Sequence, residues 1–200
     1  MEYQTVNMAM FPLSTFLLPG EEIPLRIFEP RYIQLINDCE KTGMTFGIPY
    51  IEGKGITNYG SEVELQNTVA KNSLNEMVIM VKGLRNFHLL NFRDELPGKL
   101  YGGGIIEYLN DQFHTHSPEL AVLIKKLKLD VDPMFGTLPK TESYNLTDIA
   151  KSIMLTSEDK FKFYSLRNQF RMEQFLITRL KYYELIKKQE EKLENNFMLN

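Results

Sequence analysis

Apolar side chains alternate with other types along most of the first 110 residues, and this alternation constrains the fold more than any other feature. Ile23, Leu25 and Ile27, for example, are separated by Pro24 and Arg26. A period of two is typical of strands that bury one face. The pattern predicts strands at residues 8–13, 23–27, 44–50, 62–70, 77–81, 87–92 and 101–109. Because closure removes exposed strand edges, so many short strands favour a closed or nearly closed antiparallel barrel.

One helix is expected to interrupt these strands, over residues 30–41. Pro30 suits the first turn of a helix, where its missing N–H costs nothing. Gly43 suits the left-handed residue that ends a helix. The residues that would face the barrel recur at helical spacing: Tyr32, Leu35, Ile36 and Cys39.

After residue 116 the apolar period becomes helical, so the fold class is α+β. We expect a barrel domain at residues 1–112 and an α-helical domain at 117–200. Four helices are predicted there: one that begins near Ser117, one over 146–154, one that begins at Thr156 and one over about 170–194. A long loop is expected at 130–145.

Composition and charge exclude several classes of protein. With 43% hydrophobic and 24% charged residues, the chain is neither disordered nor a disulfide scaffold. No apolar run approaches the roughly 18 residues that cross a bilayer, so we expect no membrane association. The single cysteine, Cys39, cannot form an internal disulfide, and this favours a cytoplasmic location. The net charge of −3 argues against nucleic-acid binding.

The sequence contains no recognisable motif for bond-making chemistry, so we expect no enzymatic activity, no cofactor and no catalytic residue. The string GIPYIEGKG has the wrong spacing for a phosphate-binding loop. The three histidines lack companion ligands, so we expect no metal site. Gly102, Gly103 and Gly104 fall within a predicted strand and favour a bulge or a tight barrel corner.

A distinctive motif occupies residues 11–32, which read FPLSTFLLPGEEIPLRIFEPRY. This segment resembles the opening of the Lon N-terminal domain, the substrate-binding domain of the ATP-dependent protease La. The likeness continues through Phe46-Gly47-Ile48 and residues 81–87, and extends over nearly the whole chain. One departure is Asn86, which stands where the family usually has arginine.

The resemblance implies a PUA-like β pseudobarrel followed by a helical bundle. It further implies a non-catalytic module that binds proteins or unfolded polypeptide segments. The ATPase and protease domains of the full-length family members are not found in residues 1–200, so we expect a stand-alone Lon-domain protein. A full-length Lon-type protease is one candidate partner.

Within the motif, we expect Phe28, Glu29, Pro30, Arg31 and Tyr32 to have structural roles. Phe28 and Tyr32 would pack the helix on the barrel, because aromatic side chains more often fill cores than bind ligands. Glu29 and Arg31 would form an ion pair at the start of the helix.

Four apolar residues are the candidate peptide-binding residues, because they lie among turn residues in expected loops: Phe16, Leu17, Met134 and Phe135. They would offer apolar contacts in a groove, or lie beside a free strand edge that accepts an added strand.

Two other hypotheses compete with peptide binding. Some PUA-like barrels bind RNA or a small ligand, although a shared fold alone does not establish function. Alternatively, the helix at 170–194 would offer a surface for self-association, which would make the protein a homodimer.

Overall fold

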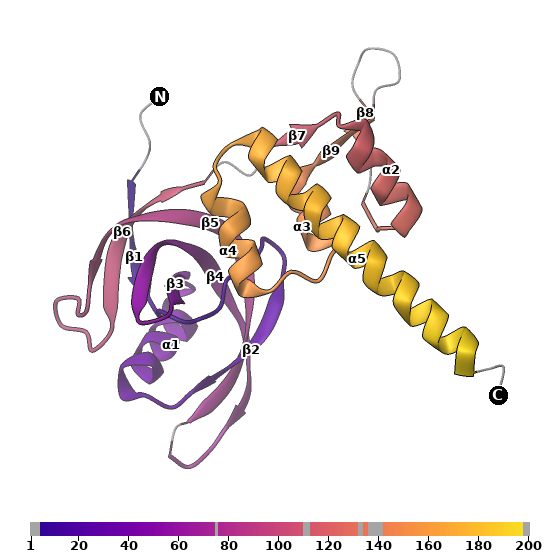
Figure 1. Cartoon of the computed structure of the whole chain (residues 1–200). Coiled ribbons are helices and arrows are strands. Elements are labelled where there is room, and N and C mark those ends of the chain that lie inside the picture. Colours follow the sequence, from indigo (N-terminus) through magenta and orange to yellow (C-terminus); the bar gives the residue numbers. More distant parts are fainter. Residues whose placement is uncertain (1–4, 75, 110–112, 132–133, 136–141, 198–200) are drawn as a thin grey trace. The chain divides into compact units, whose positions relative to one another are not determined.

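The computed structural model describes residues 5–74, 76–109, 113–131, 134–135 and 142–197 (Figure 1). The chain divides into two compact units. The first comprises Met1–Asn110 together with Thr156–Phe161. The second comprises Asp111–Leu155 together with Lys162–Asn200.

The first unit is a ring of strands, as the alternating pattern predicts. Its strands are β1 (Thr5–Met10), β2 (Glu22–Ile27), β3 (Phe46–Glu52), β4 (Gly55–Lys71), β5 (Met77–Arg93) and β6 (Gly102–Tyr108). Their order is β2-β5-β4-β3-β1-β6, and β6 pairs back to β5. The first half of β5 pairs with β2 and the second half with β6, so the ring closes through β5.

The strand β5 is one continuous element where the sequence predicts two strands, at 77–81 and 87–92. Val63 of β4 lies opposite Gly83, while Glu62 lies opposite Arg85. Leu84 is therefore the extra residue of a bulge, and this bulge accommodates the expected turn residues without reversing the chain.

The ring is mixed, and the expectation of an all-antiparallel barrel is wrong at one position. β1 and β3 run parallel, with Met10 opposite Gly47 and Leu13 opposite Tyr50. Parallel neighbours need a long crossover connection. Here β2 and helix α1 (Pro30–Thr42) provide it, because both lie between β1 and β3 in the chain.

Helix α1 confirms the prediction made for residues 30–41. Pro30 occupies its first turn, and Gly43 adopts a φ of +70° and donates its N–H to the carbonyl of Cys39. The helix buries Tyr32, Leu35, Ile36 and Cys39 in a cluster that includes Ile79 and Val81 of β5. A second cluster lies within the ring, where Met10, Phe87 and Ile106 of β1, β5 and β6 meet.

The glycines of β6 confirm the structural interpretation of Gly102-Gly103-Gly104. A Cβ atom on Gly104 would lie 2.3 Å from the carbonyl oxygen of Asn91 and 2.9 Å from the terminal methyl of Met10. The β5–β6 ladder also contains a register shift between Leu89 and Asn91. Glycine is required here because another strand's backbone approaches closely.

The second unit combines helices with a small sheet. Its helices are α2 (Pro118–Leu127), α3 (Leu146–Lys151), the last part of α4 (Ser157–Ser165) and α5 (Gln169–Phe197). Its strands are β7 (His114–Thr115), β8 (Met134–Phe135) and β9 (Glu142–Asn145), in the order β7-β9-β8. Side chains of α5 are described through Glu190.

Two predicted helix starts of this region are confirmed, whereas the predicted loop is not. Ser117 caps α2 by accepting the N–H of Leu120, and Thr156 accepts the N–H of Asp159 at the start of α4. The expected loop at 130–145 contains β8 and β9. These strands are too short to show a period of two, which explains why the sequence pattern misses them. No helix among the described residues is long and apolar enough to cross a membrane.

We expect Gly104→Ala to lower the free energy of unfolding by about 1–3 kcal/mol, because an added methyl group has no space beside the Asn91 carbonyl. Urea denaturation measures the change. Gly55→Ala is the matched control, because nothing lies within 4 Å of its added Cβ. Equal stability of the two variants would contradict the close packing of β6 on β5.

Candidate functional site

The structure contradicts the expectation that Phe16 and Leu17 are exposed for peptide binding. Each is only 1% exposed. The ring of Phe16 lies 6.1 Å from that of Tyr50 and 6.4 Å from that of Phe161, between ring centroids. Both residues belong to the core of the first unit, so their side chains are not available to a partner in this structure.

Buried polar side chains explain why this segment, residues 14–18 (the strap), lies against the barrel. The Ser61 hydroxyl accepts the Leu17 N–H and donates to the Leu17 carbonyl, both at 2.9 Å. Nδ2 of Asn86 donates to the same carbonyl at 2.8 Å. Gly83 permits the close approach, because a Cβ there would lie 2.6 Å from the Leu18 carbonyl oxygen.

The other two candidates, Met134 and Phe135, belong to the second unit. Their backbones form β8, in register with Ser143 and Glu142 of β9. Their side chains lie outside the described residues, so a role in binding stays a prediction.

The FEPRY motif has the expected structural roles with one exception. Arg31 and Glu29 form an ion pair at 2.8 Å, and the ring of Tyr32 lies 3.8 Å from that of Phe11, between centroids. Phe28, in contrast, is 58% exposed, so its expected packing between helix and barrel is wrong. The physical reason is strand alternation: Ile27 is buried, which turns the next side chain to the opposite side.

A hollow of about 360 Å³ lies at one end of the ring, and we term it the barrel mouth. The C-terminal ends of β1, β3 and β5 and the N-terminal ends of β4 and β6 meet there, because β4 and β6 run opposite to the other three. The start of α1 completes the wall. The lining includes Phe11, Pro12, Leu13, Glu29, Arg31, Tyr32, Ile51, Ile56 and Phe92.

The barrel mouth combines apolar surface with the Glu29–Arg31 ion pair and a further carboxylate, Asp94. Ile56 is 38% exposed, and Leu13, Ile51 and Phe92 are half-buried. The Arg31 guanidinium lies 4.5 Å from the centroid of the Tyr32 ring. Burial raises the pKa of the Tyr32 phenol, which is protonated at neutral pH even without this shift. Such a surface can hold apolar side chains while its polar groups bond a backbone.

A second groove of about 340 Å³, which we term the edge groove, lies between the end of α1 and β4. Cys39, Glu40, Gly43 and Met44 form one side, and residues 64–68 form the other. Burial raises the pKa of the Cys39 thiol to about 11. A protonated, buried thiol is a poor nucleophile, which agrees with the packing role expected of Cys39.

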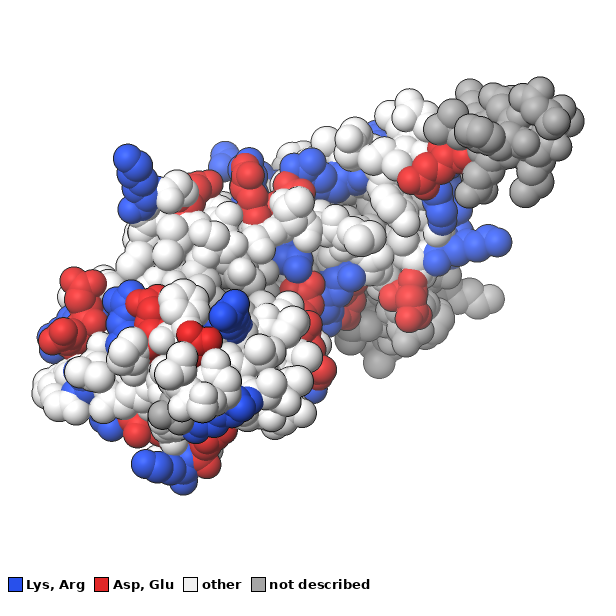
Figure 2. All heavy atoms as spheres, turned by 90° about the horizontal axis from the view of Figure 1, so that it is seen from below, with Lys and Arg blue, Asp and Glu red and all other residues white. Residues whose placement is uncertain are grey.

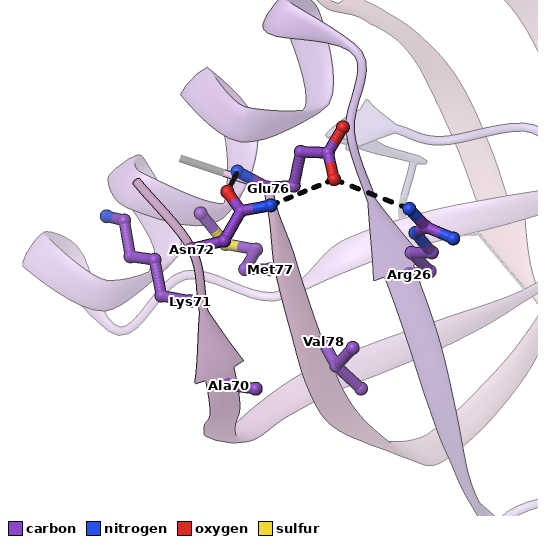
Figure 3. Close-up of a pocket in the computed structure, with 7 residues that line it drawn as sticks. All are labelled: Arg26, Ala70, Lys71, Asn72, Glu76, Met77 and Val78. Atoms are coloured by element: carbon purple, nitrogen blue, oxygen red, sulfur yellow. Dashed lines mark hydrogen bonds and ion pairs between the residues drawn. The ribbon is translucent and has the colours of Figure 1, made fainter. Parts of the chain in front are cut away.

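A third hollow, of about 220 Å³, lies beside the β4–β5 turn (Figure 3). The Glu76 carboxylate forms an ion pair with the Arg26 guanidinium at 3.4 Å and accepts a hydrogen bond from Nδ2 of Asn72 at 3.0 Å. Oδ1 of Asn72 accepts the N–H of Glu76 at 2.9 Å, as Figure 3 shows. These polar groups bond to one another and fix the turn, so we assign this hollow a structural role.

Neither the charges on the face shown in Figure 2 nor the metal-ligand pattern of the described residues indicates a further site. On the face displayed in Figure 2, Lys and Arg side chains are interspersed with Asp and Glu. Within the described ranges, no group of three or more His, Cys, Asp and Glu residues could hold a metal ion.

Comparisons with known proteins relate the chain to one family. A family model described as the ATP-dependent protease La (LON) substrate-binding domain matches residues 7–195. The Lon N-terminal domain protein from Xanthomonas campestris is 26% identical, with a TM-score of 0.64 over 86% of this chain and 97% of that one. The N-terminal domain of Mycobacterium avium complex Lon protease is 10% identical, with a TM-score of 0.47 over 88% and 95%. A comparison with curated proteins finds no match.

We expect Ser61→Ala to lower the free energy of unfolding by about 1–3 kcal/mol, because the variant leaves the buried N–H of Leu17 without a partner. Chemical denaturation of the two proteins measures this difference. Ser73→Ala, at an exposed turn position, is the control and should leave stability unchanged. A stable Ser61→Ala protein would show that the strap does not depend on this hydroxyl.

Proposed function

Because the chain belongs to the family of ATP-dependent protease La (LON) substrate-binding domains, we propose that it recognises protein substrates by binding short polypeptide segments at the barrel mouth. The similarity to the Xanthomonas campestris protein supports the same fold over most of the chain. We further propose that the chain binds without catalysing a reaction of its own.

One observation favours the barrel mouth as the binding site. Two separate parts of the family-like motif line the same hollow, although β2 lies between them in the chain: residues 11–13, and Glu29 with Arg31 and Tyr32. Phe11 and Tyr32 pack against each other and shape its floor. The half-exposed Leu13 and Ile56 remain available for contact with another chain.

In the proposed binding, buried apolar side chains supply affinity and polar groups of the barrel mouth orient the bound segment. Covering about 100 Å² of apolar surface contributes about 2.5 kcal/mol, so an apolar side chain of the substrate would supply much of the affinity. Glu29 and Arg31 would orient the segment by hydrogen bonds to its backbone, because each carries exposed polar atoms beyond those that form their ion pair.

We expect Ile56→Ser to weaken the binding of reduced, carboxymethylated α-lactalbumin, a permanently unfolded chain, about 5- to 30-fold. Loss of one apolar contact of about 1–2 kcal/mol gives this change. Fluorescence anisotropy with the full chain measures the Kd. Leu90→Ser is the matched control, because Leu90 is 46% exposed and does not line the barrel mouth.

Three results would contradict the proposal. Unchanged binding by the Ile56→Ser variant would exclude the barrel mouth as the site. Turnover of ATP or of a peptide by the purified chain would exclude a purely binding role. Salt-dependent retention of RNA, with no affinity for the unfolded chain, would favour nucleic-acid recognition instead.

A further inference from the structure

The strand β4 is longer than the strand that covers one of its sides. β4 contains 17 residues and β3 contains 7. The β3–β4 ladder ends where Phe46 lies opposite Val63. Beyond that pair, residues 64–71 are bonded to β5 on one side, and no strand among the described residues pairs with the other side. The long β4–β5 hairpin is visible in Figure 1.

The connection to α1 explains why this edge is unpaired. The helix ends at Thr42 and the chain turns at Gly43, so β3 cannot begin early enough to continue along β4. The edge groove lies at this position, between the end of α1 and residues 64–68. An added strand in the groove would continue the line of β3.

The unpaired edge has the dimensions of a short strand. At about 3.3 Å per residue, residues 64–71 span about 26 Å. An edge with free N–H and C=O groups is a template for another extended chain. Bulges at Gln66 and Val69 interrupt the ladder with β5, and they restrict regular pairing to a few residues. Side-chain contacts must therefore supply part of the affinity.

Two carboxylates, Glu40 and Glu64, line the edge groove on opposite faces of the sheet, and no lysine or arginine lines it. Lys71, at the far end of the edge, lies opposite the buried Met77 and so points to the α1 side. Glu64 accepts a hydrogen bond from Nε2 of Gln66 at 2.7 Å. Thr68 lies opposite the buried Ile79, so it points to the α1 side, where its hydroxyl donates to Glu40 at 2.6 Å. Leu65 lies opposite the buried Val81, so the adjacent Glu64 points to the other face.

The outer face keeps a negative balance although a lysine is nearby. Lys82 of β5 lies in register with Glu64 of β4 and with Glu22 of β2. Two carboxylates therefore flank one ammonium group in this row. Because successive side chains of a strand point to opposite faces, an added strand would place its side chains toward both Glu40 and Glu64.

We propose that the edge of β4 at residues 64–71 binds an extended, lysine- or arginine-bearing segment of a substrate protein as an added strand. This inference rests on the proposed function, and it specifies a class of substrate segment and a second contact surface. Backbone bonds to β4 would fix the extended conformation. Basic side chains on its two faces would meet Glu40 and Glu64.

Three matched ten-residue fluorescent peptides test the proposal on the full chain at low salt. The first alternates threonine and valine around two lysines, the second replaces the lysines by glutamates, and the third is the lysine peptide N-methylated at alternate backbone nitrogens. We expect anisotropy to show binding of the first peptide and at least tenfold weaker binding of the other two. Combining Glu40→Gln with Glu64→Gln should weaken binding of the first peptide about tenfold. Glu95→Gln, at an exposed loop position, should leave its affinity unchanged.

Two results would overturn the strand proposal. The N-methylated peptide binding as tightly as its parent would exclude backbone pairing. An unchanged Kd in the Glu40→Gln, Glu64→Gln variant would exclude the groove.

The Ile56→Ser variant separates this proposal from the proposed function. It should bind the lysine peptide normally while it loses affinity for the unfolded α-lactalbumin. Loss of both would place the peptide in the barrel mouth, which overturns the strand proposal and leaves the proposed function intact.

Discussion

The pairing of β5 with three other strands is the constraint on which the first unit depends. β5 pairs with β4 along most of its 17 residues, while its other side pairs first with β2 and then with β6. The second half closes the ring and so creates the barrel mouth. The first half supports the part of β4 that extends past β3 and leaves the edge groove beside α1. Both proposed surfaces therefore follow from the length of one hairpin.

Features set by local sequence could be predicted. The period of two located the strands of the first unit, and Pro30 with Gly43 located α1, because these signals act within a few residues. The ion pair of Glu29 with Arg31 was likewise predictable from two neighbouring positions. The parallel pairing of β1 with β3 was not, because it depends on where an entire crossover returns the chain.

Features set by distant residues could not be predicted. Phe16 and Leu17 look like loop residues, yet Ser61, Gly83 and Asn86 bury their segment from 44 to 69 positions away in the chain. Asn86 differs from the arginine usual in the family, and this difference marks position 86 as unusual. It does not indicate that the side chain bonds the Leu17 carbonyl. The barrel mouth was missed for the same reason, since Ile51, Ile56 and Phe92 meet the motif only after the ring has closed.

The central claim is that an unfolded substrate chain binds the barrel mouth. Titration of the ¹⁵N-labelled chain with carboxymethylated α-lactalbumin, followed by two-dimensional NMR, tests it residue by residue. We expect the largest changes in amide resonances at Leu13, Tyr32 and Ile56, which line the barrel mouth. Changes confined to the second unit, at concentrations where the unfolded chain is bound, would contradict the account.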